Sequence, residues 1–179
     1  RTNLPNPLYD YQYDLDDPRI RLQVVAKSNK IGVTEILLRR MIRKAFAECA
    51  SYQQIILTHR YDLALENMRR IQSMLRASTR LHPYFDEKNS NMGRTVFTHQ
   101  PGTEFLACPA VAGAVRGYPR VKHAFIDEAA HFVQVEDEEM LAATLARISN
   151  TNGSLDIVST QKGQRGFFPR IVKSADPIP

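Results

Sequence analysis

The sequence predicts an α/β domain with a mainly parallel central sheet, helices on both faces and an inserted β-hairpin. Short apolar runs alternate with helix-like segments along most of the 179 residues, and this alternation is typical of βαβ units. Hydrophobic residues make up 43% of the chain and charged residues 24%, an ordinary balance for a globular protein. We therefore expect residues 1–179 to form a single domain with its own core.

The first half of the chain predicts two strand–helix pairs. Residues 22–27 (LQVVAK) form a short apolar run that ends at a polar loop, which indicates a buried strand. Residues 34–49 place apolar side chains at three- and four-residue spacings, which indicates a helix with Thr34 at its N-cap. Residues 53–60 (QQIILTHR) and 62–78 repeat the pattern as a second strand and a second helix.

The second half predicts a hairpin and a further strand–helix–strand unit. Residues 94–109 alternate around Pro101-Gly102, which is a hairpin signal. Residues 123–127 (HAFID) indicate a third buried strand, residues 136–148 a helix with an acidic first turn, and residues 154–160 (SLDIVST) a fourth strand. Ligands of parallel α/β sheets bind at the carboxyl ends of the strands, so the polar residues that follow each strand are the candidate site.

The loop after the first strand resembles a phosphate-binding loop without its usual lysine. A Walker A loop reads G-x-x-x-x-G-K-[ST], and Val33 stands where the lysine is expected, between Gly32 and Thr34. The required cation could come from Lys27 or from Lys30. The candidate phosphate-binding residues of this loop are Lys27, Ser28, Asn29, Lys30, Ile31, Gly32, Val33, Thr34 and Glu35.

The segment HAFIDEAAHF (residues 123–132) matches a Walker B pattern, in which an apolar strand ends in two acids. Asp127 would hold the hydration shell of Mg²⁺ together with the Thr34 hydroxyl, and Glu128 would orient the water that attacks ATP. The structural alternative makes Asp127 a helix cap and Glu128 a first-turn acid. Adjacent carboxylates at the end of a buried strand repel each other, which favours the functional interpretation.

In this order, the motifs resemble the ATPase domain of viral terminase large subunits of the tailed-phage type. The resemblance covers LYDYQYDLDDPRIRLQVVAKSNKIGVT, TVFTHQPGTEFLACPAVAGAVRGYPRVKHAFIDEAAHF and LDIVSTQKGQRGFF. It implies a P-loop NTPase of the additional-strand (RecA/ASCE-like) type. By the same resemblance, Tyr11 and Gln12 would read adenine and Arg116 would act on a neighbouring subunit's nucleotide, while Ser159-Thr160 would couple hydrolysis to movement.

The resemblance also implies cofactors and partners. ATP and Mg²⁺ would drive packaging of double-stranded DNA, with a portal protein, a small terminase subunit and a homo-oligomeric ring as partners. No apolar run is long enough to span a membrane, and the expected location is the cytoplasm of an infected host cell. The chain starts with Arg1 and has no counterpart of the family's nuclease domain, so we expect an excised N-terminal fragment.

Two rival functions remain open. A superfamily 2 helicase also carries an acidic box close to DEAAH, although the Arg-Gly-Tyr element before it favours a terminase. A non-catalytic module for DNA binding or scaffolding would explain Val33, whereas the intact Asp127-Glu128 pair argues against it. The net charge of +5 permits DNA binding, and Lys162, Arg165, Arg170, Phe167 and Phe168 form a candidate DNA-facing edge. The basic clusters at residues 39–44 and 69–80 are interpreted as solvated helix faces.

Overall fold

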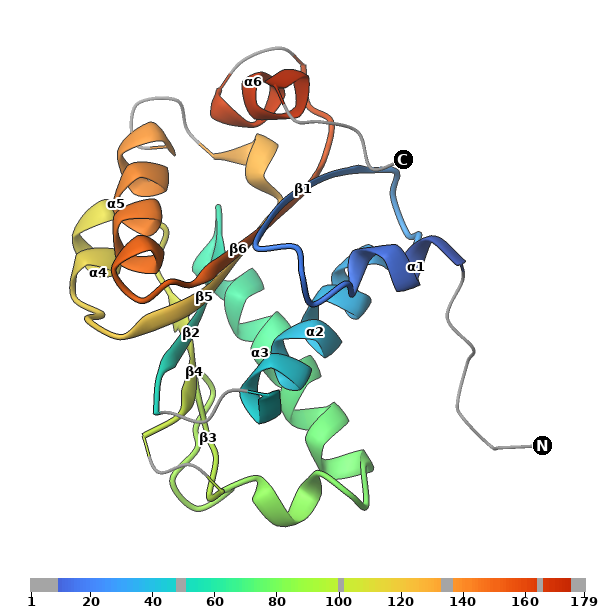
Figure 1. The fold of residues 1–179 in the computed structure, drawn as a ribbon, viewed down its shortest axis with the longest axis vertical. Helices are drawn as coiled ribbons and strands as arrows, with labels where there is room; N and C mark the ends of the chain where they lie inside the picture. The colour runs from blue at the N-terminus through green and yellow to red at the C-terminus, as the bar shows by residue number, and fades with distance from the viewer. Residues whose placement is uncertain (1–9, 48–50, 100–101, 133–136, 164–165, 175–179) are drawn as a thin grey trace.

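The structure, a computed structural model, describes residues 10–47, 51–99, 102–132, 137–163 and 166–174 (Figure 1). Its six-stranded sheet consists of β1 (Leu22–Lys27), β2 (Gln53–Thr58), β3 (Arg94–Val96), β4 (Glu104–Cys108), β5 (Val121–Asp127) and β6 (Ser154–Thr160). The α-helices are α1 (Asp10–Leu15), α2 (Val33–Ala47), α3 (Tyr61–Ala77), α4 (Ala112–Arg116), α5 (Asp137–Asn150) and α6 (Phe167–Ser174). Two short 3-10 helices, η1 (His82–Tyr84) and η2 (Ala129–His131), complete the described elements.

The strand order confirms the predicted fold class. The sheet runs β1-β6-β5-β2-β4-β3, and every neighbouring pair is parallel except β3 and β4. Strand β6 therefore lies between β1, which leads into the phosphate-loop sequence, and β5, which ends in the two acids. This inserted position is the additional strand of the predicted architecture.

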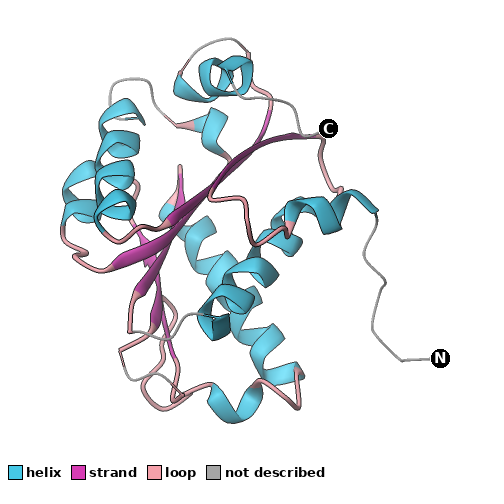
Figure 2. Ribbon diagram, viewed as in Figure 1, coloured by secondary structure: helices cyan, strands magenta, loops and turns pink. Residues whose placement is uncertain are grey.

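Helices cover both faces of the sheet, as Figure 2 shows. Helices α2 and α3 pack on one face and α4 and α5 on the other, with a separate hydrophobic cluster beneath each pair. Successive residues of a strand point to opposite faces, so β5 contributes Phe125 to the first cluster and Ala124 and Ile126 to the second. A sheet that is buried on both faces explains why its central strands read as continuous apolar runs.

Several predicted boundaries need correction. The predicted strand 53–60 ends at Thr58, because α3 begins at Tyr61. Helix α2 begins at Val33, so Thr34 lies inside its first turn and is not the N-cap. The predicted hairpin is present as β3 and β4, but β4 also pairs with β2 and thus belongs to the central sheet. Helices α1, α4 and α6 were not predicted.

Other expectations concern the surroundings of the core. Cys108 is buried with a free thiol, and burial raises the pKa of that thiol to about 12, as expected of a core cysteine. Cys49, Pro101, Arg165 and residue 136 lie outside the described residues. Among the helices that the structure describes, none combines the length and apolar character needed to cross a membrane.

Candidate nucleotide-binding site

The loop between β1 and α2 folds back over the carboxyl end of β1. Lys30 and Gly32 adopt the left-handed conformation, with φ of 61° and 78°. A Cβ atom on Gly32 would lie 3.0 Å from the Gln12 side-chain nitrogen, so both the backbone and the space require glycine there. The N–H of Ile36 donates to the Gly32 carbonyl at 3.2 Å, which starts the helix directly after the loop. The N-terminus of α2 is thereby held at the strand end.

Helix α1 packs over the loop and contacts its backbone. The Tyr11 hydroxyl donates to the Ile31 carbonyl, and the Gln12 side-chain amide donates to the Gly32 carbonyl at 3.4 Å. Gln12 is buried, which indicates that it supports the loop from behind. The structure thus brings both residues to the loop, while their contact with adenine stays a prediction.

The candidate cations differ in their surroundings. The Lys27 side chain is 10% exposed, and its ammonium lies 3.0 Å from Oε1 of Glu128. Lys30 is exposed at the crest of the loop. Val33 is only 2% exposed and packs into the core beneath α2, as expected for an apolar side chain at this position. Lys27 is therefore the cation that the fold places between the loop and the acids.

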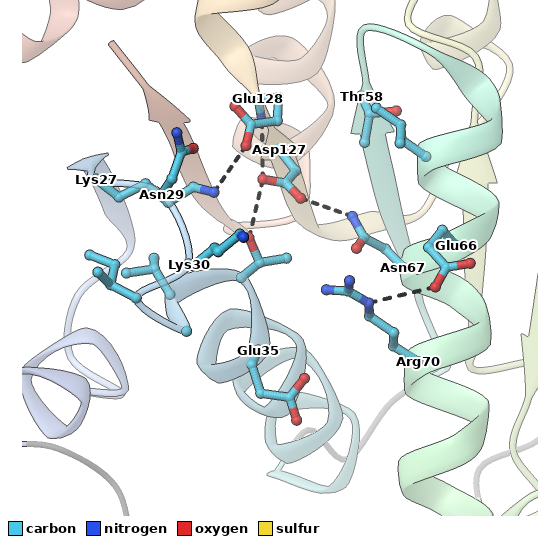
Figure 3. Close-up of a pocket in the computed structure, with 15 residues that line it drawn as sticks. Lys27, Asn29, Lys30, Glu35, Thr58, Glu66, Asn67, Arg70, Asp127 and Glu128 are labelled. Carbon is cyan, nitrogen blue, oxygen red and sulfur yellow. Dashed lines mark hydrogen bonds and ion pairs between the residues drawn. The ribbon is translucent and has the colours of Figure 1, made fainter.

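Asp127 is fixed at the end of β5 by three donors. Its Oδ1 accepts from the Thr34 hydroxyl at 3.4 Å and from the Glu128 N–H at 3.0 Å, and its Oδ2 accepts from the Asn67 side chain at 3.0 Å (Figure 3). Burial raises the pKa of Asp127, against the opposing effects of the Asn67 hydrogen bond and the Lys27 charge. A buried carboxylate beside a hydroxyl offers two oxygen ligands for a hard cation.

Glu128 connects the predicted site residues of three strands. One carboxylate oxygen contacts Lys27 of β1, and the other accepts from the Thr160 hydroxyl at 3.1 Å and from the Ser159 hydroxyl at 3.4 Å. Burial raises the pKa of Glu128, but Lys27 and Thr160 lower it by more, so the pKa is lowered overall. Its φ of 55° is unfavourable for a side chain with a Cβ, and such strain clusters at functional sites.

These residues line a cleft of about 460 Å³ between the loop and α3. The predicted residues that line it are Lys27, Asn29, Lys30, Ile31, Gly32, Val33, Thr34, Glu35, Asp127 and Glu128. The opposite wall was missed by sequence reasoning and consists of Thr58, Leu63, Glu66, Asn67 and Arg70. A signal was present for Asn67, because it is a polar residue on the face of α3 that also carries the buried Ala64, Met68 and Ile71.

Two predicted residues lie apart from the cleft. Arg116 ends α4 on the opposite face of the sheet, where its guanidinium pairs with Glu139 at 2.9 Å. Its side chain is 56% exposed, so it remains accessible to another molecule. Ser28 is exposed and is not part of the cleft lining. The structural alternative for the acids is also wrong in detail, because Asp127 belongs to β5 and its side chain accepts from Thr34 across the cleft.

Comparisons with known proteins identify the fold. No protein-family model matches the chain, and no curated protein matches it significantly. The large terminase ATPase domain of Thermus phage P74-26 superposes with a TM-score of 0.71 at 20% identity, over 91% of this chain and 68% of that one. The HK97 bacteriophage large terminase gives a TM-score of 0.73 at 16% identity, over 95% of this chain and 38% of that one.

The large terminase of a thermophilic bacteriophage gives a TM-score of 0.75 at 14% identity, over 93% of this chain and 42% of that one. That protein has also been solved in complex with ADP and with ATP-γ-S. The present chain therefore has the fold of phage large terminase ATPase domains, which are P-loop NTPases. It spans well under half the length of the two longer terminases.

Proposed function

We propose that this chain is the ATP-hydrolysing motor domain of a terminase large subunit, which translocates DNA into a viral capsid. The observation that carries the proposal is the convergence of Lys27, Thr34, Asp127 and Glu128 on one cleft. The position of β6 between β1 and β5, and the likeness of the fold to phage terminase ATPase domains, support the same conclusion.

Phosphate binding rests on the loop and on one lysine. The backbone N–H groups around Gly32 and the N-terminus of α2 favour an anion, and Lys27 adds a full charge in a partly desolvated position. Thr34 and Asp127 would hold Mg²⁺, which neutralises charge on the β- and γ-phosphates. Two protein oxygens suffice, because Mg²⁺ in such sites completes its coordination with water and phosphate oxygens.

Hydrolysis rests on Glu128. The lowered pKa keeps this carboxylate ionised at neutral pH, so it can accept a hydrogen bond from the attacking water and polarise it. Phosphate oxygens compete with Glu128 for the Lys27 ammonium, and this competition frees a carboxylate oxygen for the water. The Ser159 and Thr160 hydroxyls contact the same carboxylate, which gives β6 a direct means of sensing the state of the site.

Replacing the base tests the proposal directly. The Glu128→Gln variant should still bind Mg-ATP, while its hydrolysis falls by on the order of a hundredfold or more, because the water loses its base. Glu87→Gln is the matched control, since Glu87 is a half-exposed glutamate that pairs with Arg76 away from the cleft. Unchanged steady-state turnover of Glu128→Gln, measured in the assembled protein, would exclude this role.

Nucleotide titration separates the rival functions. A fluorescent ATP analogue should bind in the presence of Mg²⁺ and more weakly after its removal by a chelator. A non-catalytic DNA-binding or scaffold module predicts no Mg²⁺-dependent binding. A helicase-like ATPase predicts binding as well, but its turnover should respond to single strands more than to duplex DNA.

The remaining partners follow from the same proposal. Double-stranded DNA, a portal protein, a small terminase subunit and a homo-oligomeric ring are proposed as partners, in the cytoplasm of an infected host cell. The net charge of +5 is compatible with gripping phosphates. Binding should then be insensitive to DNA sequence and fall steeply with salt, and a strong preference for one sequence at fixed salt would contradict it.

The predicted DNA-facing edge is only partly supported by the structure. Phe167 and Phe168 are buried in the core, so they do not face a ligand. Arg170 is exposed but pairs with Glu138 on α5, which offsets its charge. Lys162 is exposed and stays a candidate for DNA contact.

A further inference from the structure

One face of α3 forms the wall of the cleft opposite the loop. Leu63, Glu66, Asn67 and Arg70 all line the cleft, and their three- and four-residue spacings place them on one side of the helix. Asn67 already belongs to the site, because its amide donates to Asp127. Arg70 lies about one turn further along, and Figure 3 shows its guanidinium directed into the cleft toward the loop.

The charges that line the cleft leave a need for this arginine. Among the described lining residues, Lys27, Lys30 and Arg70 are the cations, against four carboxylates from Glu35, Glu66, Asp127 and Glu128. A nucleoside triphosphate carries three to four negative charges, so its phosphates need more than the backbone can offer. Val33 occupies the position of the usual lysine and contributes no charge.

Arg70 has hydrogen-bonding capacity to spare. Within the described part of the chain, the ion pair of Arg70 joins its Nε to Oε1 of Glu66 at 3.8 Å, which is longer than a hydrogen bond. The other oxygen of Glu66 accepts from Arg69 at 3.0 Å. The two terminal nitrogens of Arg70 can therefore present a fork to phosphate oxygens.

We propose that Arg70 is a phosphate-binding residue of the nucleotide cleft, which supplies from α3 a charge that the loop lacks at Val33. The inference rests on the proposed function, because it assigns a ligand group within the same cleft. It concerns an arginine of the same chain, in contrast to Arg116, which lies on the other face of the sheet.

Arg69 provides an internal control for the experiment. Arg69 and Arg70 are 55% and 49% exposed, lie on the same helix and share Glu66, but only Arg70 lines the cleft. Alanine is the best helix former, so neither Arg69→Ala nor Arg70→Ala should unfold α3. Calorimetric titration with Mg²⁺ and ATP-γ-S, ADP or AMP then measures how each change affects binding of one, two or three phosphates.

The expected result is a loss of affinity that is specific to Arg70 and to the phosphate chain. Arg70→Ala should weaken ATP-γ-S binding about tenfold or more, as expected for loss of a charge-assisted contact. Arg70→Lys should retain part of the affinity, and Arg69→Ala should stay within about twofold of the wild type. AMP binding should change less than ATP-γ-S binding in Arg70→Ala.

Two kinds of result would overturn the inference in distinguishable ways. If the wild type binds ATP-γ-S and the two alanine variants bind equally well, Arg70 does not contact phosphate and the proposed function stands. The same conclusion follows if Arg70→Ala weakens AMP and ATP-γ-S binding by the same factor. If the wild type binds no nucleotide in the presence of Mg²⁺, the proposed function and this inference both fail.

Discussion

Lys27 occupies the place where an added charge has the largest effect. Its side chain emerges from the last residue of β1, is shielded from water and reaches Glu128 across the end of β6. In a partly desolvated site, one ammonium interacts with phosphate much more strongly than it would in water. Lys30, in contrast, projects from the exposed crest of the loop, where solvent screens its charge.

Alanine substitutions at three loop positions should therefore differ. Lys27→Ala should abolish detectable nucleotide binding, Lys30→Ala should weaken it less, and Val33→Ala should leave it nearly unchanged. Val33→Ala should instead lower the free energy of unfolding by about 1–3 kcal/mol, because it removes buried methyl groups. Equilibrium titration with Mg-ADP and chemical denaturation measure the two effects.

A crystal structure with ADP would check the assignment independently. The Lys27 ammonium should lie within hydrogen-bonding distance of a β-phosphate oxygen. A contact from Lys30, with Lys27 turned to solvent, would move the role to the loop crest. If neither lysine approached the phosphates, the non-catalytic alternative would gain the support that the proposed function loses.

Asp127 should reduce the stability of the protein in the absence of nucleotide. It is an acid whose pKa is raised in the folded protein, so folding disfavours the ionised form. The penalty is fully present above the raised pKa and disappears as the pH falls below the ordinary value of 3.8. The carboxylate is thus kept for binding at a cost in stability.

The Asp127→Asn variant tests this sign. At pH 7 without nucleotide, its Tm should exceed that of the wild type by a few degrees, on the order of 1 kcal/mol, since no buried charge remains. The Asn67 amide can rotate to accept a hydrogen bond from the new amide. The gain should vanish near pH 4, and Mg²⁺-dependent nucleotide binding should be lost. A lower Tm at pH 7 would show that the ionised carboxylate is stabilising.

Helix α2 is anchored by a buried arginine that also positions the N-terminal segment. Arg40 is fully buried, and its Nε donates to Asp156 of β6 at 3.1 Å. Its terminal nitrogens donate to the carbonyls of Leu15, Asp17 and Ile20, which follow or end α1. One guanidinium thus joins α2, the sheet and the segment that holds α1 over the loop. Packing at the amino ends of the strands thereby stabilises the site at their carboxyl ends.

Two arginines of α2 should consequently differ in their effect on stability. Arg40→Met should lower the free energy of unfolding by about 3–5 kcal/mol, because it leaves Asp156 buried without its cation. Arg43→Met should cost about 1 kcal/mol or less, since its pair with Asp16 is partly exposed. Urea denaturation at pH 7 measures both. Equal losses would mean that the buried pair has no special role.

The arrangement of the full domain separates the two candidate arginines. The cleft opens beside α2 and α3, whereas Arg116 lies on the face covered by α4 and α5 (Figure 1). A residue so placed can serve only the cleft of another subunit. The proposed ring of subunits would bring the Arg116 face of one copy against the cleft of the next.

Mixing two inactive variants tests this arrangement. In assembled protein, an Arg116→Ala subunit retains an intact Glu128, and a Glu128→Gln subunit retains an intact Arg116. Mixed rings should therefore hydrolyse ATP faster than either variant alone at the same total concentration. Turnover is measured across a series of mixing ratios, and an absence of rescue at every ratio would argue against an arginine acting between subunits.

Local pattern was enough to predict much of the fold and the candidate site. Strands 22–27 and 154–160 match the structure at both ends, because each is a short apolar run bounded by polar residues. The sharp loop was marked by Gly32, since only glycine suits its backbone and its approach to Gln12. The strand exits at Lys27, Glu128 and Thr160 were also readable, because parallel strands end at a common edge of the sheet.

Contacts between distant segments depended on the three-dimensional arrangement. Lys27 and Glu128 are 101 residues apart, and they pair because β6 is wide enough to separate their strands yet narrow enough for a lysine to reach across. Asn67 and Arg70 enter the cleft only because one face of α3 packs beside it. Periodicity shows that a helix has two faces and that a strand has two edges. Which neighbour each one meets is set by strand order and packing, and these arise from the whole chain at once.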